Sequence, residues 1–340
     1  MRKSFANSFA ATFMAANICL ASPAFADDLQ TYNLDTMVVT AQRESKRDVD
    51  TPASVTTVSQ KQLVETGAAN LFDALRLQSG VTTYSYGGSQ SLGGMNAKIL
   101  MRGANKGTVV MIDGVPANIN ETYYLDSIPV ESIARVEIVK GAASTLYGSD
   151  AKGGVINIIT KKPEKISTYF RVDGGSNSIT NYYMGQSGKE KDWSWDANVS
   201  RNLSGDFKDG EGVTTPSSSK STSTNFKITK KLSDKHELTA TYDSYKADYK
   251  YTALWEPALK NGKVDNQNYK FILNSDFDGN TTNVLSFVNL DNDTDFNGYK
   301  TKTNTKRITD QLSAQLGNHL LTAGFEFSHD KVITFNGKKM

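Results

Sequence analysis

Residues 319–331 read HLLTAGFEFSHDK, and apolar side chains alternate with polar ones along this stretch. In an extended chain Leu321 and Phe325 fall on one face, whereas Thr322 and Glu326 fall on the other. A period of two residues predicts a β-strand with one apolar and one polar face. The pattern recurs towards the N-terminus, and about nine strands are predicted in all, at residues 167–174, 178–187, 191–200, 223–231, 236–246, 267–274, 281–290, 304–316 and 319–331.

The connections between these predicted strands alternate in length. The short ones are 188–190, 232–235, 275–280 and 317–318, and the long ones are 201–222, 247–266 and 291–303. A meander with short turns on one side and long loops on the other is typical of an outer-membrane β-barrel. A soluble β-sandwich gives no reason for such alternation. We therefore predict antiparallel transmembrane barrel strands over residues 166–340.

The composition narrows the class of protein. Among 340 residues, 38 Lys and Arg face 36 Asp and Glu, which gives a formal net charge of +2. This balance argues against a polybasic nucleic-acid binder. No apolar run reaches about 18 residues, so no transmembrane helix is predicted. The single cysteine, Cys19, excludes an internal disulfide framework.

Residues 1–26 have the order of a secretory signal peptide. Arg2-Lys3 gives a basic start, and the stretch from Phe5 to Leu20 is largely apolar. Ala24-Phe25-Ala26 then offers a small-x-small cleavage site. A buried helix is the alternative, but it does not explain the three-part order. We expect the mature chain to begin after residue 26 and to contain no cysteine.

Residues 27–47 are mostly polar and hold one short apolar island, Met37–Ala41. The island is too short to bury a core of its own. An extended segment with free backbone donors and acceptors can add a strand to the edge of a partner's sheet. An equally open interpretation makes the island the first strand of the domain that follows.

Residues 48–163 have the pattern of a small α/β domain. Strands are predicted at Ser54–Val58, Ala97–Arg102, Thr108–Ile112, Arg135–Lys140 and Val155–Thr160, and helices at Ser59–Thr66 and Leu71–Gln78. Asp113-Gly114 supplies a tight turn after the third strand. The glycine-rich joint before the last strand is not expected to bind nucleotide, because Lys152 is followed by two glycines and a strand rather than by Ser or Thr and a helix.

Three stretches follow one another along the chain: DTMVVTA at Asp35–Ala41, ILMRGANKGTVVMIDGVPAN at Ile99–Asn118, and IARVEIVKGAASTLYGSDAKGGVINIITKKP at Ile133–Pro163. They resemble, in turn, the TonB box, the Arg-Gly strand with its Asp-Gly turn, and the C-terminal signature of the plug in the TonB-dependent outer-membrane receptors. The resemblance covers residues 27–165. It is nearest to the colicin I, catecholate-siderophore and vitamin B12 receptors.

The resemblance implies active uptake across the cell outer membrane. A scarce ligand would bind over an α+β plug inside a barrel of about 22 strands. TonB would then pair with the released box and transmit the proton-motive force of the inner membrane. The residues implied to bind TonB are Asp35, Thr36, Met37, Val38, Val39, Thr40 and Ala41. The other implied partners are a ferric siderophore or similar chelate, outer-membrane lipid, and a colicin or phage; no nucleic acid, cofactor or resident metal is expected, and the receptor is expected to be a monomer.

The resemblance also assigns two groups of plug residues. The structural group is Arg102, Gly103, Asp113, Gly114, Glu137, Gly141 and Gly148. Arg102 and Glu137 are candidates for ion pairs between plug and barrel. Ligand contacts are expected from plug loops that face the outside, at Tyr84, Tyr86, Gln90, Met95, Asn118, Tyr123 and Tyr124. Tyr and Asn suit an aromatic, oxygen-rich chelate, although plain surface-loop chemistry explains them equally well.

Several functions remain to be separated. A ferric siderophore is the first candidate ligand, with cobalamin or haem as alternatives in the same family. A passive porin and a periplasmic binding or adhesion protein are the competing classes. A porin needs neither plug nor TonB box, and a periplasmic protein would be soluble once its signal is removed. No pairing of nucleophile and base is visible, so no enzyme is expected.

The predicted strands are too few to close the barrel that the resemblance implies. About nine are predicted where about 22 are expected, and an open sheet in lipid leaves backbone groups unsatisfied. We therefore expect a receptor truncated at its C-terminus, which would not transport by itself.

An acidic motif in the predicted loop 291–303 invites a calcium interpretation. Asp291-x-Asp293-x-Asp295 has the spacing of the first ligands of an EF-hand loop. Phe296 stands where that loop needs glycine, so the EF-hand pattern fails. Calcium binding by this loop is left open.

Overall fold

The structure is a computed structural model of the chain. It describes residues 38–39, 46–47, 54–68, 70–84, 98–101, 107–117, 125–141, 151–208, 210–253, 256–335 and 338–339. All of them belong to one compact unit, Val38–Met340. The predicted signal peptide lies outside them. None of the helices in these residues is long and apolar enough to cross a membrane.

The region predicted as the plug, called the plug below, is built on a five-stranded sheet. Its elements are β3 (Ser54–Ser59), α2 (Gln60–Glu65), α3 (Leu71–Leu75), β4 (Val81–Tyr84), β5 (Lys98–Met101), β6 (Thr108–Ile112), β7 (Val115–Pro116), the 3-10 turns η3 (Leu125–Ser127) and η4 (Val130–Ser132), β8 (Ile133–Lys140) and β9 (Gly154–Thr160). The sheet order is β3-β8-β9-β6-β7, and β4 pairs separately with β5. β6 runs parallel to β9, whereas the other pairs are antiparallel. The α/β pattern expected for this region is therefore present.

Local sequence signals set both helices of the plug. The side chain of Ser59 accepts a hydrogen bond from Gln62 N and that of Gln62 accepts one from Ser59 N, which is a capping box. Asn70 caps α3 by accepting from Asp73 N at 3.0 Å. α3 ends at Leu75, earlier than expected, because the next amides bond three residues back and tighten the last turn.

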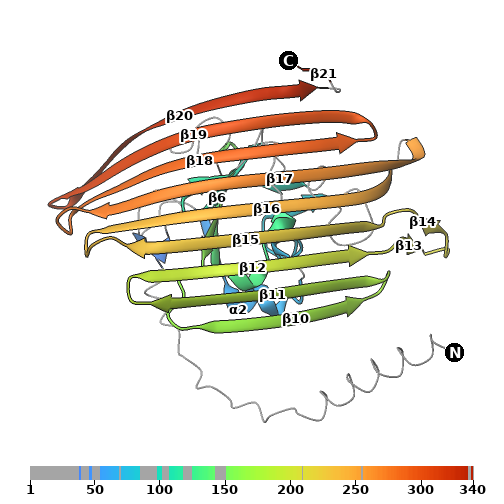
Figure 1. The fold of residues 1–340 in the computed structure, drawn as a ribbon, viewed down its shortest axis with the longest axis horizontal. Helices are drawn as coiled ribbons and strands as arrows, with labels where there is room; N and C mark the ends of the chain where they lie inside the picture. Colours follow the sequence, from blue (N-terminus) through green and yellow to red (C-terminus); the bar gives the residue numbers. More distant parts are fainter. Residues whose placement is uncertain are drawn as a thin grey trace, which may run out of the picture. The chain divides into compact units, whose positions relative to one another are not determined.

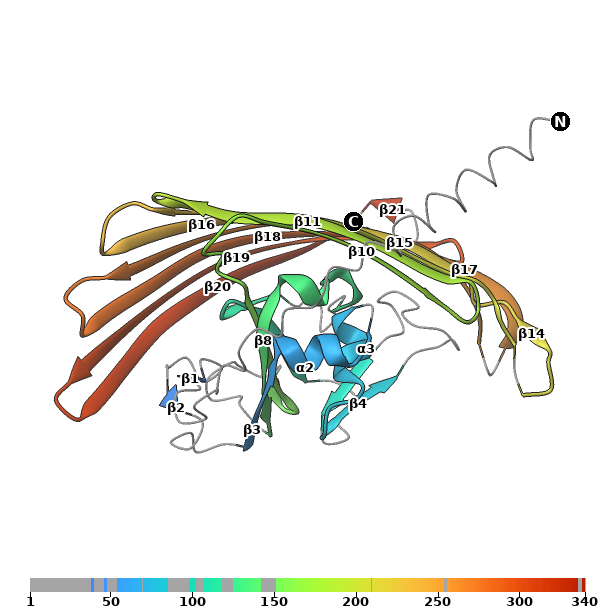
Figure 2. The same cartoon turned by 90° about the horizontal axis from the view of Figure 1, so that it is seen from below.

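The core of the plug lies between α2, α3 and the sheet (Figure 2). Eighteen buried side chains form it: Val58, Leu63, Ala68, Leu71, Phe72, Ala74, Leu75, Val81, Met101, Val110, Leu125, Ile128, Val130, Ile133, Val136, Ile138, Ile156 and Ile158. β8 and β9 lie in the middle of the sheet and supply five of the completely buried ones. Burial of this apolar surface stabilises the plug as a unit.

A ten-stranded antiparallel meander follows the plug (Figure 1). Its strands are β10 (Ser167–Gly175), β11 (Ile179–Glu190), β12 (Trp193–Ser204), β15 (Ser219–Lys231), β16 (His236–Ala253), β17 (Glu256–Asp276), β18 (Thr281–Phe296), β19 (Tyr299–Leu316), β20 (His319–Phe335) and β21 (Lys338–Lys339). The nine long strands correspond to the nine predicted. β13 (Phe207–Lys208) and β14 (Thr214–Thr215) form a small hairpin between β12 and β15. The short strands β1 (Val38–Val39) and β2 (Lys46–Arg47) pair with each other.

Two of the predicted long connections are wrong. Residues 247–266 and 291–303 are mostly strand, because β16 pairs with β17, and β18 with β19, almost to the hairpin ends. The outer face of these strand ends is polar, whereas their apolar side chains, such as Tyr245, Tyr249 and Val264, are buried on the inner face. The apolar face thus changes sides along the strand, which a single period-2 pattern does not follow. Ion pairs across neighbouring strands replace apolar contacts there, as between Lys246 and Asp265 at 2.9 Å.

The acidic motif lies in one of these strand ends. Asp293 is opposite Lys302, with Oδ2 3.9 Å from Nζ. Asp295 is opposite Lys300 at 3.8 Å. Within the described residues no cluster of three or more His, Cys, Asp or Glu side chains is placed to hold a metal. The motif is thus part of a paired strand rather than of a loop.

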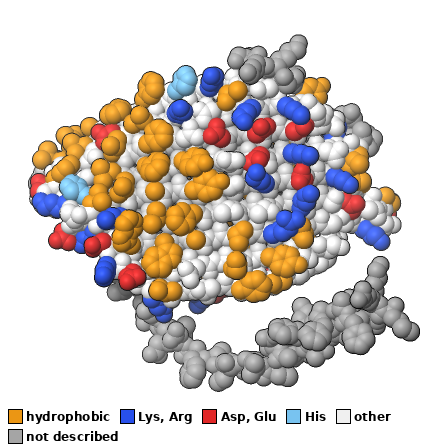
Figure 3. All heavy atoms as spheres, in the orientation of Figure 1, with side chains coloured by type: hydrophobic (Ala, Val, Ile, Leu, Met, Phe, Trp, Pro, Cys, Tyr) orange, Lys and Arg blue, Asp and Glu red, His pale blue; other side chains and the backbone are white. Residues whose placement is uncertain are grey.

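The two faces of the large sheet differ in chemistry. Large apolar side chains on the outer face are exposed, and they include Phe170, Tyr182, Phe226, Leu238, Phe271, Phe287, Ile308 and Phe325. Figure 3 shows them gathered over the half of this face near the short turns, with charged side chains over the other half. The inner face carries buried polar residues such as Asn198, Ser223 and Thr305. An apolar outer band with a polar interior is the arrangement of a transmembrane barrel wall.

Candidate functional site

The predicted TonB-binding segment is only partly described. Val38–Val39 forms β1 and pairs antiparallel with Lys46–Arg47. These two residues of the segment are therefore in strand conformation, and the assignment of the segment to TonB binding stays a prediction. The other predicted TonB-binding residues, Asp35, Thr36, Met37, Thr40 and Ala41, lie outside the described residues.

The predicted ligand contacts also fall largely outside them. Tyr84 is the last residue of β4, and only its backbone is described. The remaining predicted contacts, Tyr86, Gln90, Met95, Asn118, Tyr123 and Tyr124, are not among the described residues. The assignment of these loops to ligand binding stays a prediction.

The Asp113-Gly114 turn is the best-defined of the predicted plug features. Asp113 has φ of 52° and Gly114 φ of 80°, so β6 and β7 are joined by a two-residue turn with both central residues at positive φ, as the Asp-Gly pair predicts. The Asp113 carboxylate accepts from Thr160 N at 2.9 Å and from Thr160 Oγ1 at 2.8 Å. Gly114 N donates to Asn157 Oδ1 at 3.1 Å. The hairpin is therefore fixed to β9, inside the plug.

Three cations on alternate strands of the large sheet reach this hairpin. Lys227 on β15 lies 3.5 Å from Asp113 Oδ2 and also donates to Thr160 Oγ1. Lys270 on β17 donates to the Ile112 carbonyl at 3.3 Å. Arg307 on β19 donates to the Pro116 carbonyl at 3.1 Å. Three strands that lie far from the plug in sequence thus hold one plug hairpin through side chains on the inner face of the sheet.

These cations set the charge state of Asp113. Burial alone would raise the pKa of this carboxyl. The positive charges of Lys227 and Lys270 and the two hydrogen bonds from Thr160 outweigh burial, so the pKa lies below the usual value of 3.8. Asp113 is therefore ionised at neutral pH, and the hairpin presents a carboxylate to two ammonium groups.

An apolar contact accompanies the polar ones. Val115, directly after the turn, packs in a cluster with three side chains from β17 and β18: Ile272, Val288 and Leu290. Each of these four side chains is at most 4 % exposed. Close packing of a dry cluster gives the hairpin a fixed position on the sheet in addition to its ionic contacts.

A second attachment joins the plug to the first strands of the sheet. Glu131 on η4 forms an ion pair with Arg171 on β10. The Arg171 guanidinium also lies 3.0 Å from Asp173 and stacks 4.2 Å from the centre of the Tyr183 ring. Tyr183 in turn donates to Asn202 at 2.9 Å. The guanidinium is thus held on three sides.

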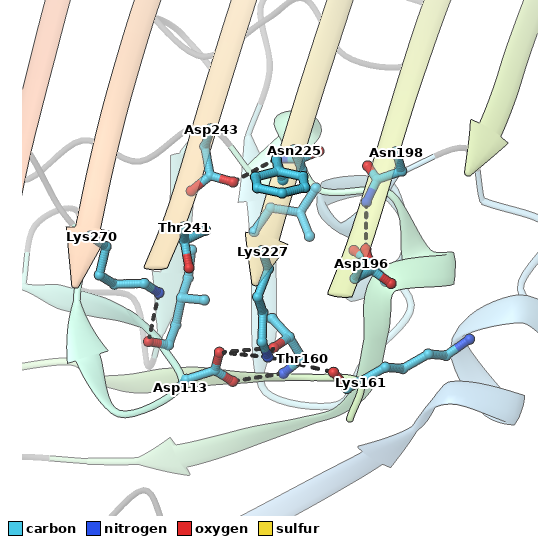
Figure 4. A pocket seen from close by; sticks show the side chains of 14 residues that line it. Asp113, Thr160, Lys161, Asp196, Asn198, Asn225, Lys227, Thr241, Asp243 and Lys270 are labelled. Atoms are coloured by element: carbon cyan, nitrogen blue, oxygen red, sulfur yellow. Dashed lines mark hydrogen bonds and ion pairs between the residues drawn. The ribbon is translucent and has the colours of Figure 1, made fainter. Parts of the chain in front are cut away.

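A pocket of about 50 Å³ lies between the two attachments (Figure 4). It is lined by Ile112, Asp113, Ile128, Ser132, Thr160 and Lys161 of the plug and by Asp196, Asn198, Asn225, Phe226, Lys227, Thr241, Asp243 and Lys270 of the sheet. Two amides in it are paired with carboxylates: Asn198 donates to Asp196 at 2.9 Å, and Asn225 to Asp243 at 2.8 Å. A single water molecule needs a cavity of roughly 10–15 Å³, so the pocket has room for a few water molecules.

The other predicted structural residues of the plug have mixed outcomes. Glu137 is completely buried in β8, where it accepts from Arg135 Nε at 2.9 Å and from Asn157 Nδ2 at 3.3 Å, so these partners are plug residues rather than barrel residues. Gly141 has φ of 113°, which favours glycine. The remaining three, Arg102, Gly103 and Gly148, lie outside the described residues. Ion pairing of Arg102 with the barrel stays a prediction.

Sequence reasoning did not identify the sheet residues of the site. Lys227, Lys270 and Arg307 all lie in predicted strands, on the polar face. The available signal was a cation on the inward face of every second strand. Within a single strand, however, such a cation looks like any other residue of the polar face. Their common target becomes visible only when the strands are aligned in register.

Comparison with known proteins finds relatives of the plug region and of the fold. Residues 47–155 match the family model described as the TonB-dependent Receptor Plug Domain. A vitamin B12 transporter, BtuB, from Vibrio vulnificus (strain CMCP6) is 38 % identical over 159 residues, which are 46 % of this chain and 25 % of the transporter. The chain thus spans about a quarter of that relative's length.

Solved receptor structures share the fold at low sequence identity. A mutant of the ferric enterobactin receptor PfeA from Pseudomonas aeruginosa superposes with a TM-score of 0.67 at 15 % identity, covering 88 % of this chain and 51 % of that chain. The ferric-catecholate import receptor Fiu from E. coli K12 gives 0.64 at 18 % identity, with coverages of 86 % and 51 %. The chain therefore consists of a TonB-dependent receptor plug domain followed by an antiparallel sheet with the barrel fold of the receptors of that family.

Proposed function

We propose that this chain belongs to a TonB-dependent receptor of the outer membrane that imports a scarce ligand. The observation that carries the proposal is the plug itself, attached by the Asp113-Gly114 hairpin to the polar inner face of a barrel-type sheet. A passive porin conducts solutes through an open barrel and needs no plug domain attached to the barrel wall. We further propose residues 1–26 as signal peptide, 27–47 as tether and 48–163 as plug.

The order of strands in the plug suits coupling by a pulling partner. β3 follows the predicted TonB-binding segment and is one edge of the plug sheet, whereas β7 of the attached hairpin is the opposite edge. A pull on Val38 would therefore reach the plug at the edge that is remote from the hairpin. The plug could be rearranged without first breaking the contacts of Lys227, Lys270 and Arg307.

A ferric siderophore is the first candidate ligand. The predicted outward loops, with Tyr84, Tyr86 and Asn118 among them, carry side chains that suit an aromatic, oxygen-rich chelate. Cobalamin is the second candidate, and it is favoured by the identity of the plug region to a vitamin B12 transporter. With either ligand, we propose that the protein is a transporter rather than an enzyme.

Uptake assays test the coupling step. The gene would be expressed from its own locus, so that every encoded segment is present, in cells with and without TonB. Val38→Pro removes a backbone N–H needed for strand pairing with TonB, so we expect it to abolish uptake and leave ligand binding at the cell surface unchanged. Val38→Ala keeps that N–H and should transport normally. Uptake that continues without TonB, or with the proline variant, would reject the coupling role.

A panel of ligands separates the two candidates. Growth under iron limitation would be scored with ferric catecholate and ferric hydroxamate complexes, and cobalamin-dependent growth with cyanocobalamin. TonB-dependent rescue by one iron chelate supports a siderophore receptor, whereas rescue by cyanocobalamin alone replaces it by a cobalamin receptor. Recovery of the protein in the soluble periplasmic fraction would reject both.

A further inference from the structure

The outer face of the large sheet changes from apolar to charged along its strands (Figure 3). On β19 and β20 the two kinds of surface meet within one step of the register. Ile308 and Phe327 are opposite each other and belong to the apolar band. The next pair on the same face is Lys306 opposite His329, and Lys331 follows two residues further along β20. Lys306, His329 and Lys331 are called the β19–β20 rim below.

The rim lies on the face of the sheet that points away from the plug. Thr305 and Arg307 flank the rim lysine of β19 and point inward, since Thr305 is only 2 % exposed and Arg307 donates to a plug carbonyl. Asp330 separates the two rim residues of β20 and accepts from Thr305 Oγ1 at 2.6 Å. Neighbours in a strand point to opposite faces. All three rim side chains are therefore on the outer face, where they are exposed.

The two rim lysines lack the counter-charge that other lysines of this face have. Lys306 and Lys331 have no ion-pair or hydrogen-bond partner among the residues that the structure describes. Asp291, on the neighbouring β18, accepts hydrogen bonds from two amide groups instead. The ion-paired lysines of the outer face include Lys220 with Asp248, Lys246 with Asp265, Lys300 with Asp295 and Lys302 with Asp293.

Unpaired ammonium groups beside an apolar band suit an amphiphile with an anionic head group. The hydrocarbon stems of lysine lie along apolar surface while the charged ends reach the polar side. Lysine binds phosphate as a point charge, and an imidazole N–H can donate to the same oxygens. No concave cage surrounds the three exposed side chains, so a small free anion would gain little here. An apolar chain on Ile308 and Phe327 would add hydrophobic contact to the ionic one.

The position of the rim along the strands indicates one leaflet of the membrane. β19 and β20 are joined by the short turn at 317–318, and the rim begins about eleven residues from this turn on either strand. A tilted transmembrane strand needs about 9–11 residues to cross the hydrocarbon core. Short turns of outer-membrane barrels lie on the periplasmic side. The rim therefore falls at the head-group level of the outer leaflet.

Resting on the outer-membrane location of the proposed function, we propose that the β19–β20 rim binds the phosphate groups of an outer-leaflet lipid, lipopolysaccharide, whose acyl chains lie on the adjoining apolar band. Lys306 and Lys331 occupy diagonal positions on neighbouring strands, which are about 7–8 Å apart. Two long side chains at that spacing can reach one phosphate. Over β15 and β16 the same face is ion-paired within itself and offers no such excess of charge.

Titration with lipid A, the phosphorylated anchor of lipopolysaccharide, tests the proposal. The receptor is expressed from its own locus, so that every encoded segment is present. It is purified in an uncharged detergent, freed of co-purifying lipid and titrated with bisphosphorylated lipid A, with binding followed by native mass spectrometry. We expect Lys306→Gln/Lys331→Gln to weaken binding by about 25-fold. This is about fivefold for each lysine, or about 1 kcal/mol.

Two further variants make the result specific. Lys220→Gln/Lys246→Gln removes the same charge from ion-paired lysines three or more strands away, about 14 Å, which exceeds the Debye length of about 8 Å. We expect this control to bind within about twofold of the unmodified protein. Lys306→Arg/Lys331→Arg keeps the charge and should retain binding, which separates a loss of contact from a loss of folding.

Several outcomes would overturn the proposal. They are equal affinities of the two glutamine double variants, undiminished binding of lipid A from which both phosphates have been removed, and displacement of lipid A by millimolar inorganic phosphate, which would indicate an ion site. The titration does not depend on uptake. A receptor that binds lipid A as expected but shows no TonB-dependent uptake rejects the proposed function alone, whereas normal uptake with equal affinities rejects this inference alone.

Discussion

Replacement of Asp113 by Asn is the sharpest test of how the plug is attached. The Asp113→Asn side chain has the same shape, and Asn tolerates the positive φ of 52° at this position. Its carbonyl oxygen can still accept from Thr160 N, now at 2.9 Å. The substitution therefore removes one negative charge and leaves the turn intact.

The expected loss follows from the charges that remain. Lys227 lies 3.5 Å from the carboxylate, and their side chains are only 16 % and 23 % exposed. At an effective dielectric constant of about 20, unit charges at this separation attract by about 4–5 kcal/mol. Desolvation of the pair offsets roughly half of this. We expect Asp113→Asn to destabilise the plug by about 2 kcal/mol, or about 30-fold in its opening equilibrium.

Amide exchange measured by mass spectrometry gives that ratio directly. Peptides from β9 report on opening of the plug, because Asp113 accepts from Thr160 at the end of that strand. The matched control is Asp234→Asn, which makes the same chemical change in an ion pair with Lys231 whose carboxylate is 95 % exposed. Exposed pairs contribute about 0–1 kcal/mol, so the control should exchange almost as the unmodified protein does.

The pH adds a second reading of the same contact. Because the pKa of Asp113 is lower in the folded protein than its usual 3.8, its contribution is complete above about pH 4 and is lost only as the pH falls further. A change of less than about threefold in β9 exchange for Asp113→Asn at neutral pH, with a silent Asp234→Asn control, would refute the ionic attachment.

Two further substitutions test the interior of the plug. Burial, offset in part by Arg76, raises the pKa of Asp73 to about 6. The folded state therefore binds more protons than the unfolded state between about pH 4 and 6. The free energy of unfolding should fall by about 3 kcal/mol as the pH rises across that window. Asp73→Asn should remove this slope in urea unfolding, and an unchanged slope would contradict the assignment. Gly154→Ala should cost about 3 kcal/mol or more, because Gly154 has φ of +148° and a Cβ there would collide with the Val139 carbonyl. Gly210→Ala, at a site with open space, is its control, and equal melting temperatures for the two variants would show the reasoning to be wrong.

Much of the plug was predictable from local sequence. Ser59 and Asn70 mark helix starts because their side chains satisfy free backbone amides within three residues. Asp113-Gly114 marks a two-residue turn because both positions need positive φ. Such signals are complete within a few residues of chain, so no tertiary contact is required to read them.

The long strand ends were not predictable in the same way. Beyond the apolar band the outer face is polar on both sides of the hairpin, as at Lys246 and Asp265. The apolar side chains there, such as Tyr245 and Tyr249, are buried on the inner face instead, so the period-2 pattern changes phase within the strand. Backbone pairing continues there because neighbouring strands are already aligned, a cooperative effect that single-strand periodicity does not carry.

The sequence alone determined the order of the regions, the presence of about nine strands in the sheet and the resemblance to the TonB-dependent receptors. It could do so because period-2 patterns, turn residues and motifs are local properties of the chain. Only the tertiary structure decided which side chains meet across the plug and the sheet. Lys227, Lys270 and Arg307 are separated by about forty residues each, and antiparallel pairing with alternating side-chain direction is what turns all three towards one hairpin. The attachment of the plug is therefore a property of strand register, which exists only in the folded sheet.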